Sequence, residues 1–416
     1  MKNDMKKILV LVTTSFPYGK LEPFIESELN YYNNFDKVLC YAIHKTGEPR
    51  DITYPANFEF KHIKDYKFKR DIKYLPKLLF KKNFWSEIFT LAKSSRLSIR
   101  TIHHLVSVGL QTEHFYKHLK TEIENFDKNS EGNNKYYFYS YWMVEHALSC
   151  IGLKRHFKNS INFTRAHGYD LYEYRNKGKY IPYRKYILDN TDLVMPISED
   201  GFRYLQEQYG QHSNIELSRL GTVDNGISQK ADSEYDLTVV SCSWCVGVKR
   251  IDRIISSMAM IRDLKIKWIH IGDGNLYNTL KTLAKETLPA NIDCEFIGQL
   301  TNKKILEFYR NNHIDLFINV SSSEGIPVSI MEAQSFGIPV IATNVGGVKE
   351  IITDSMNGYM LEKDFKDEEL VSLIASYAQK HDDRKKGLRT TSRSMWETNY
   401  SAEKNYTELF NKIAKS

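Results

Sequence analysis

Apolar residues recur along this chain in short unbroken runs, separated by longer stretches in which apolar and polar positions follow a helical period. Such runs are typical of strands buried on both faces of a parallel sheet. In the first half they lie at 7–13, 37–42, 136–142, 161–166 and 193–197. In the second half they lie at 237–241, 267–272, 294–298, 314–320 and 338–343.

Strands and helices alternate in both halves, which predicts an α/β protein made of two doubly wound, Rossmann-like domains facing a cleft. Among the helices, one is expected at 143–157, and another runs to Tyr209 after Ser198 and Glu199, a good capping pair. The polar stretch 225–235 forms the boundary. We therefore expect domains at 1–222 and 236–395, followed by a C-terminal segment at 396–416.

The most informative loop follows the apolar run 314–320 and reads SSSEGIPVSIMEA from Ser321. Pro327 suits the first position of a helix, because it has no N–H to lose there. The backbone N–H groups of Gly325, Ile326, Val328 and Ser329 then lie at a helix N-terminus, which carries a partial positive charge. The pattern predicts an anion site, most simply one for phosphate.

Two glutamates flank this loop eight residues apart. Glu324 precedes the helix and Glu332 lies more than one turn inside it, so they face different parts of one bound molecule. Carboxylates accept well from pairs of hydroxyl groups, as in the sugar and ribose of a sugar nucleotide. The alternative is an ordinary strand–loop–helix unit with solvated or capping glutamates. A second glycine loop at 344–350 (NVGGVKE), after the strand-like IPVIAT, favours the functional reading.

At these residues the chain resembles the glycosyltransferase family 4 retaining transferases of the GT-B fold. Their signature, E-G-x-P-x-x-x-x-E-A followed by G-x-P-V-I-A-T-x-x-G-G, stands here as EGIPVSIMEA and GIPVIATNVGG. The resemblance implies that Glu324 contacts the transferred sugar and that Glu332 contacts the donor ribose. It also implies that the last helix crosses back to the first domain.

The same resemblance assigns residues to the donor diphosphate. The family uses an arginine and a lysine separated by four residues. Lys249 matches the lysine, but Trp244 stands at the arginine position, so Arg250 is the candidate substitute. The loop after 294–298 resembles the edge that reads the nucleobase, at Ile297, Gln299 and Leu300. Which base is read is not visible.

Two further loops in the first half carry the resemblance. SFPYGKLEPFIESE resembles the opening of a branch that builds capsule, exopolysaccharide and teichoic acid, and it implies that Gly19 approaches the donor diphosphate and the acceptor. RAHGYD carries the family's H-G-x-D, which implies that His167 lies near the sugar at the reaction centre. The alternatives are a plain strand-to-helix turn and a structural histidine.

The charge distribution along the chain indicates a further kind of partner. The net charge is +7, and the segment 61–100 holds twelve Lys or Arg against three acids, interleaved with aromatic and aliphatic residues. A basic amphipathic segment suits an anionic membrane surface. The alternative is a solvated face with core contacts. No nucleic-acid-binding motif appears, so we expect no nucleic-acid partner.

Cysteines and histidines offer weaker signals. The pair Cys242 and Cys245 forms C-x-x-C, but a zinc site lacks a second pair and no thioredoxin-like helix follows directly. His114 and His118 lack the H-E-x-x-H pattern and are expected on a helix surface. No apolar run approaches the length of a membrane span. The short apolar N-terminal run lacks a cleavage site, so we expect a cytoplasmic protein that can lie at the inner face of the membrane.

The chemistry expected is therefore sugar transfer from a nucleotide-diphosphate sugar, with a UDP-sugar favoured, to a surface-glycan or lipid-linked acceptor. No D-x-D motif follows an apolar strand. We accordingly expect no metal and no cofactor beyond the donor, with cations of the chain stabilising the leaving diphosphate. A glycosidase, an epimerase on the same architecture, and a non-catalytic relative that binds a membrane or a partner are the alternatives.

Overall fold

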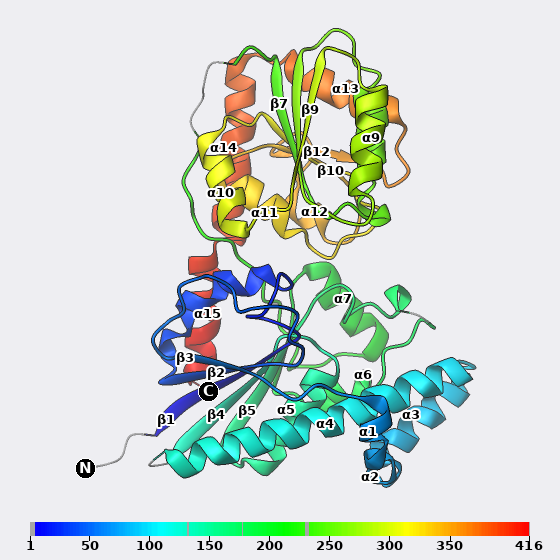
Figure 1. Cartoon of the computed structure of the whole chain (residues 1–416), viewed down its shortest axis with the longest axis vertical. Coiled ribbons are helices and arrows are strands. Elements are labelled where there is room, and N and C mark those ends of the chain that lie inside the picture. The colour runs from blue at the N-terminus through cyan, green and yellow to red at the C-terminus, as the bar shows by residue number, and fades with distance from the viewer. Residues whose placement is uncertain (1–4, 131–132, 177, 229–232, 416) are drawn as a thin grey trace. The chain divides into compact units, whose positions relative to one another are not determined.

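The computed structural model describes residues 5–130, 133–176, 178–228 and 233–415 (Figure 1). They form two units. The first comprises the described residues up to Arg219 together with those from Tyr406 onward, and the second runs from Leu220 to Asn405. The segment expected at 396–416 thus contributes to both units.

The sheet of the first unit has six parallel strands in the order β3-β2-β1-β4-β5-β6. The strands are β1 (Lys6–Thr13), β2 (Lys37–Ala42), β3 (Phe58–His62), β4 (Asn134–Ser140), β5 (Ser160–Ala166) and β6 (Leu193–Pro196). The strand order reverses between β1 and β4. In open α/β sheets, ligands bind at the carboxyl ends of the strands at such a point.

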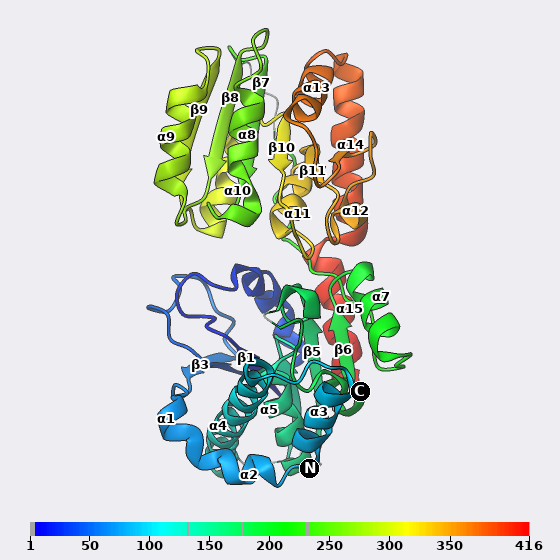
Figure 2. The ribbon, with the colours of Figure 1, turned by 90° about the vertical axis from the view of Figure 1, so that its right-hand side faces the viewer.

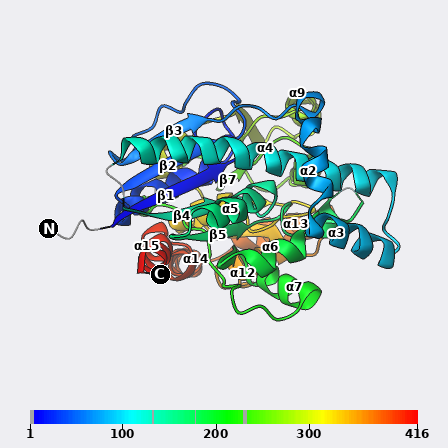
Figure 3. The same ribbon diagram turned by 90° about the horizontal axis from the view of Figure 1, so that it is seen from below.

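Helices cover both faces of this sheet. They are the 3₁₀ helices η1 (Pro23–Asn34), η2 (Ile72–Tyr74) and η3 (Glu173–Arg175), and the α-helices α1 (Phe68–Asp71), α2 (Leu75–Leu79), α3 (Lys82–Lys93), α4 (Ile99–Asn129), α5 (Glu145–His156), α6 (Arg184–Asn190), α7 (Glu199–Tyr209) and α15 (Ala402–Lys415). Figures 2 and 3 show α4 and α5 on one face and α15 on the other.

Alternating side chains of β4 explain the two layers. Tyr136 and Phe138 belong to a core with residues of α4 and α5. Tyr137 points the other way, where it packs edge-to-face on Phe35, and Phe410 of α15 packs against Phe35 and Tyr32. Because successive side chains of a strand face opposite sides, a run of aromatic residues serves both layers.

The second unit repeats this plan with the order β12-β11-β10-β7-β8-β9, all parallel. Its strands are β7 (Leu237–Cys242), β8 (Ile266–Ile271), β9 (Ile292–Gly298), β10 (Leu316–Asn319), β11 (Val340–Thr343) and β12 (Gly358–Leu361). Its helices are η4 (Gly247–Lys249), α8 (Ile251–Met258), α9 (Tyr277–Thr287), α10 (Asn302–Asn311), α11 (Val328–Ser335), α12 (Val348–Ile351), α13 (Asp367–Ala378) and α14 (Asp382–Asn399). The order reverses between β7 and β10.

The predicted fold class, α/β with doubly wound parallel sheets, is confirmed. Two strands were not predicted, β3 and β12. Both are short strands at the outer edge of their sheets, so they lack the continuous apolar run of a central strand. Pro327 was placed one residue too far into its helix. It precedes α11 in an extended conformation, with ψ of 113°.

The expected helix-surface position of His114 is wrong. Its side chain is fully buried, with Nδ1 3.3 Å from Oδ1 of Asp71, because α1 packs against α4 there. Ser198 does cap α7 as expected, accepting a hydrogen bond of 3.0 Å from the N–H of Gly201.

Candidate functional site

The reversal of strand order in the second unit lies beside the predicted phosphate loop. The loop after β10 leads into α11, whose first hydrogen bond within this turn runs from Ile330 N–H to the Pro327 carbonyl. The amides of Val328 and Ser329 precede this donor, so no helical carbonyl is available to them. Gly325 and Ile326 lie in the same loop. The predicted anion-binding amides therefore lie together at the carboxyl edge of the sheet.

The second glycine loop packs closely against the loop that precedes α11. Gly347 N–H donates to the Gly325 carbonyl at 2.7 Å. A Cβ on Gly346, whose φ is +55°, would lie 2.0 Å from the Glu324 carbonyl oxygen. Only glycine tolerates this approach. The loop 344–350 thus packs against the loop between β10 and α11 and supports its conformation.

Glu324 is held in an ion pair with Lys249. Lys249 Nζ lies 2.6 Å from Glu324 Oε1, and Asn319 Nδ2 donates to the same oxygen at 3.4 Å. The two charged side chains are 21% and 10% exposed. Lys249 ends η4, after β7, and Glu324 follows β10. Residues 75 positions apart are thus brought together where the strand order reverses.

Arg250 adjoins this pair but is occupied by the backbone. Its Nε donates to the Val320 carbonyl and its guanidinium to the Lys363 carbonyl, both at 2.7 Å. It also adopts φ of +50° at the start of α8. The structure therefore gives Arg250 a role in joining the end of β10 to the loop that follows β12. Trp244, at the position of the family's arginine, is 45% exposed beyond the end of β7.

Glu332 lies on α11, buried, and accepts a hydrogen bond from Asn302 at the start of α10. Asn302 comes two residues after Leu300. Gln299 and Leu300 lie in the loop after β9, Ile297 lies near the end of β9, and all three are half-buried. The predicted ribose and nucleobase residues are therefore neighbours. Sequence analysis missed Asn302. Its position in the first turn of the helix after the base loop was the available signal.

In the first unit, His167 follows β5 and lies in an aromatic cluster. Its ring centroid is 4.5 Å from that of Trp142 and 5.1 Å from that of Tyr141. Nδ1 lies 3.6 Å from Oδ2 of Asp170, and among the described residues Nε2 has no hydrogen-bond partner. Because the side chain is buried, Nε2 is a candidate for contacting a bound ligand.

Asp170 positions the loop that carries His167. Its carboxylate accepts from the backbone N–H groups of His167 at 2.7 Å and Met143 at 2.9 Å. Burial alone would raise the pKa of Asp170, but the adjacent His167 ring and the backbone donors lower it below its usual value. The carboxylate stays ionised and fixes the H-G-x-D turn.

Glu22 organises the loop after β1, and sequence analysis missed it. It is buried and left-handed, with φ of +62°. Its carboxylate accepts from the amides of Thr14 at 2.9 Å and of Ser15 and Phe16 at 2.7 Å, and from Trp142 Nε1 at 2.5 Å. The chain's own carboxylate thus occupies a nest of amides where the strand order of the first sheet reverses. The E-P-F-I-E run was the available signal.

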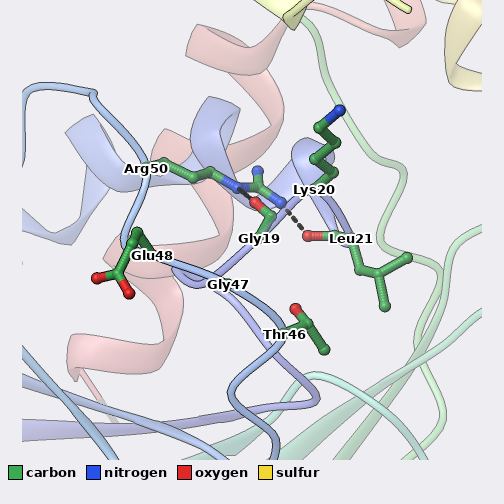
Figure 4. Close-up of a pocket in the computed structure, with 7 residues that line it drawn as sticks. All are labelled: Gly19, Lys20, Leu21, Thr46, Gly47, Glu48 and Arg50. Carbon is green, nitrogen blue, oxygen red and sulfur yellow. Dashed lines mark hydrogen bonds between the residues drawn. The ribbon is translucent and has the colours of Figure 1, made fainter.

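Gly19 lines a pocket of about 510 Å³ in the first unit (Figure 4). Its φ is +66°, and a Cβ there would meet Thr46 Oγ1 at 2.4 Å. Figure 4 shows the Arg50 guanidinium directed at the Gly19 and Leu21 carbonyls, and Nε donates to the former at 2.9 Å. The other lining residues are Lys20, Gly47 and Glu48.

The C-x-x-C pair has the environment of unreactive thiols. Cys245 is buried with Sγ 3.3 Å from His270 Nε2. Burial raises the pKa of Cys242 to about 12 and that of Cys245 to about 11. Since the thiolate is the reactive form, both are poor nucleophiles at neutral pH. Within the described ranges, no cluster of three His, Cys, Asp or Glu side chains could hold a metal ion.

Comparison with known proteins shows which proteins this chain is similar to. Residues 227–392 match the family model described as glycosyl transferases group 1. The match lies within the second unit.

An uncharacterized glycosyltransferase of Methanocaldococcus jannaschii, MJ1178, is 27% identical over 51% of this chain and 58% of its own length. The O-antigen biosynthesis glycosyltransferase WbnH of Escherichia coli is 26% identical over 44% of this chain and 54% of its own length. The chain thus spans little more than half the length of these curated relatives.

The whole fold is similar to a solved structure, Anabaena HepE in complex with UDP and glucose. The TM-score is 0.63 at 13% identity, with 99% of this chain and 100% of that chain covered. The expected GT-B fold is confirmed. In the part of the chain that the structure describes, no helix combines the length and the apolar character needed to cross a membrane.

Proposed function

We propose that this protein is a retaining glycosyltransferase that moves a hexose or similar sugar from a nucleotide-diphosphate sugar, with a UDP-sugar favoured, to a surface-glycan or lipid-linked acceptor. The observation that carries the proposal is the Lys249–Glu324 pair beside the amino end of α11. It sets an anion-binding cation, free helix amides and a carboxylate at one edge of a glycosyltransferase domain.

Each group has a task in this reaction. The bond from the anomeric carbon to the diphosphate breaks, and the acceptor hydroxyl bonds to that carbon from the same face. The proton of the hydroxyl passes to the departing phosphate oxygen. Lys249 and the amides of Val328 and Ser329 stabilise the diphosphate as its negative charge grows. Glu324, released from Lys249, orients the sugar and stabilises its developing positive charge.

The other end of the donor fits the neighbouring residues. Glu332, oriented by Asn302, accepts from the ribose hydroxyls. The half-buried loop at Ile297, Gln299 and Leu300 contacts the base with its main chain. HepE, whose solved complex contains UDP and glucose, supports a UDP-sugar as donor.

In the first unit, His167, with Nδ1 facing Asp170, contributes Nε2 to a hydroxyl group of the transferred sugar. Gly19 keeps the loop after β1 open to the donor diphosphate and the acceptor. The similarity to an O-antigen biosynthesis enzyme supports a surface-glycan acceptor. We place the protein in the cytoplasm, at the inner face of the membrane, where such acceptors are assembled on lipids.

A second candidate is a non-catalytic or weakly active relative that binds a membrane or a partner. It is favoured by Trp244 at the position of the family's arginine and by the carbonyls that engage Arg250. If this candidate is correct, Lys249 alone does not bind the diphosphate strongly enough. The two candidates differ in donor binding and turnover.

The deciding experiment is a thermal-shift and hydrolysis panel of UDP-, GDP-, ADP- and CMP-sugars, each with and without EDTA. A donor at about a hundred times its Kd should stabilise the folded protein by about 2.7 kcal/mol. Stabilisation by one nucleotide sugar, slow release of its sugar and indifference to EDTA are the expected results. Donor binding lost with EDTA would refute metal independence. No binding at millimolar concentration would favour the non-catalytic candidate.

A further inference from the structure

The basic segment 61–100 is less uniformly charged than its sequence indicates. Five of its twelve cations form ion pairs with acids of the first unit. These are Lys61 with Glu122, Arg70 with Asp71, Lys77 and Lys81 with Glu113, and Arg96 with Glu173. Charges neutralised in this way contribute little to attracting a partner. The remaining cations therefore decide where an anionic surface could dock.

Helix α3 is apolar on two sides. One side packs into the core through Phe84 and Leu91, which are 4% and 0% exposed. Trp85 and Phe89, four residues apart and so on one stripe, are 55% and 70% exposed. A helix that only covers a core needs a single apolar face, so the second face is unexplained by folding.

Segments adjacent to α3 in the chain carry two more exposed apolar residues. Phe80, between α2 and α3, is 90% exposed, and Ile99, at the start of α4, is 91% exposed. We call these four residues, Phe80, Trp85, Phe89 and Ile99, the apolar patch. Single exposed apolar residues are ordinary, but four large ones within twenty positions mark an interaction surface.

Cations flank the apolar patch. Lys82 and Lys93 lie three residues before Trp85 and four after Phe89, so they share its stripe of α3, and Arg100 follows Ile99. All three are exposed, and none takes part in an ion pair among the described residues. The Trp85 indole donates to the Leu79 carbonyl at 2.7 Å, which fixes its ring at the surface. Aromatic residues bordered by free lysines are typical of the membrane interface.

We infer that the apolar patch inserts into the interface of an anionic phospholipid bilayer, with Lys82, Lys93 and Arg100 at the headgroups. This inference specifies the residues behind the membrane location proposed above. It rests on the proposed function only for the biological role of the membrane contact. Charge complementarity selects the bilayer over a second copy of this chain, because the same three cations would face one another across a symmetric dimer.

The test uses the full chain and vesicles of phosphatidylcholine, alone or mixed with phosphatidylglycerol. Cosedimentation should be strong only with the mixed vesicles. Replacing Lys82, Lys93 and Arg100 with Gln should weaken binding about a hundredfold, at about fivefold per cation. Its matched control replaces Lys158, Lys285 and Lys386, which are exposed elsewhere, and should bind as the unaltered chain does.

Insertion is tested apart from charge. Phe80→Ser, Trp85→Ser and Phe89→Ser together should abolish the binding that survives in high salt, since salt screens only the ionic part. The control variant carries Ile227→Ser, Met260→Ser and Met356→Ser, all exposed in the second unit. Tryptophan fluorescence should shift to the blue on mixed vesicles, and Trp85→Phe should remove that shift.

Three results would overturn the inference: equal binding by the apolar triple variant at all salt concentrations, equal binding of neutral vesicles, and a solution dimer that the same variant dissociates. Donor hydrolysis measured without vesicles separates the two proposals. If hydrolysis persists while vesicle binding fails, only the membrane inference falls. If vesicles bind while no nucleotide sugar is bound or hydrolysed, the proposed function falls instead.

Discussion

Removing the Lys249 ammonium should separate its structural role from its catalytic one. Lys249→Met keeps most of the apolar length of the side chain but removes the ion pair of the buried Glu324 carboxylate, whose Oε1 also accepts from Asn319 Nδ2 at 3.4 Å. Breaking a fully buried ion pair costs about 3–5 kcal/mol. Because these side chains are 21% and 10% exposed, water compensates in part, and we expect a loss of about 1–2 kcal/mol.

The effect on transfer should be larger. A unit charge about 4 Å from the diphosphate at an effective dielectric of about 20 contributes about 4 kcal/mol. If that stabilisation is realised in the transition state, Lys249→Met lowers kcat/KM about a thousandfold. Steady-state transfer assays measure the change in kcat/KM, and urea unfolding measures the loss of stability. Lys285→Met, at an exposed lysine of α9, is the matched control and should change neither.

A double-mutant cycle with Glu324→Gln completes the test. Without Lys249 the negative charge of Glu324 is uncompensated, and Gln at this position carries no charge. The double variant should therefore regain most of the lost stability but none of the lost kcat/KM. Glu324→Ala should abolish transfer while the fold persists. Recovery of kcat/KM in the double variant would refute the reasoning, because Lys249 would then act only by neutralising Glu324. Turnover by Glu324→Ala at the level of the unaltered enzyme would refute the role of the carboxylate.

Three further outcomes are expected. Burial lowers the pKa of His146 to about 3, with the charge of His44 adding to this, and that of His270 to about 4. The unfolded chain therefore binds more protons below about pH 6.5, and the free energy of unfolding should fall from there toward pH 4, by about 1.4 kcal/mol per histidine and pH unit at most. Trp244→Arg should tighten donor binding about tenfold or more, measured by calorimetry, because a cation joins the diphosphate site. Glu22→Gln should lower the free energy of unfolding by about 1–3 kcal/mol, measured in urea, since charged acceptors make the stronger hydrogen bonds.

Each of these has an outcome that contradicts it. A His146→Gln variant whose acid sensitivity equals that of the unaltered chain would remove that histidine from the explanation, and His381→Gln, at an exposed position, is its control. Unchanged donor affinity in Trp244→Arg would show that position 244 does not reach the diphosphate. A Glu22→Gln variant of full stability would mean that the loop amides hold their conformation without a carboxylate.

Most strands were predictable because their sequences are continuous apolar runs. Residues 37–42 match β2 in full, and 161–166 and 193–197 differ from β5 and β6 by one residue. The edge strand β3 was not predictable in this way, since it alternates buried and exposed positions like any amphipathic fragment. The interaction that defines an edge strand is pairing with a distant neighbour, which no local window contains.

The residues of the candidate site were likewise predictable only in part. The roles of Glu324, Glu332 and Lys249 were proposed from motifs, because a strand, a glycine loop and a helix start are encoded within a few residues. The contacts of Asn302 with Glu332 and of Trp142 with Glu22 span 30 and 120 positions, which no local pattern specifies.

The sequence by itself determined the α/β class, the central strands and the loop at 321–350, because hydrophobic period and glycine and proline positions act over a few residues. Only the tertiary structure decided which charges remain available. It pairs Lys249 with Glu324, engages Arg250 with backbone carbonyls, and neutralises five of the twelve cations in 61–100 while leaving Lys82, Lys93 and Arg100 exposed. The physical reason is that the free energy of a charge depends on its partners and its burial, and folding supplies both from distant parts of the chain.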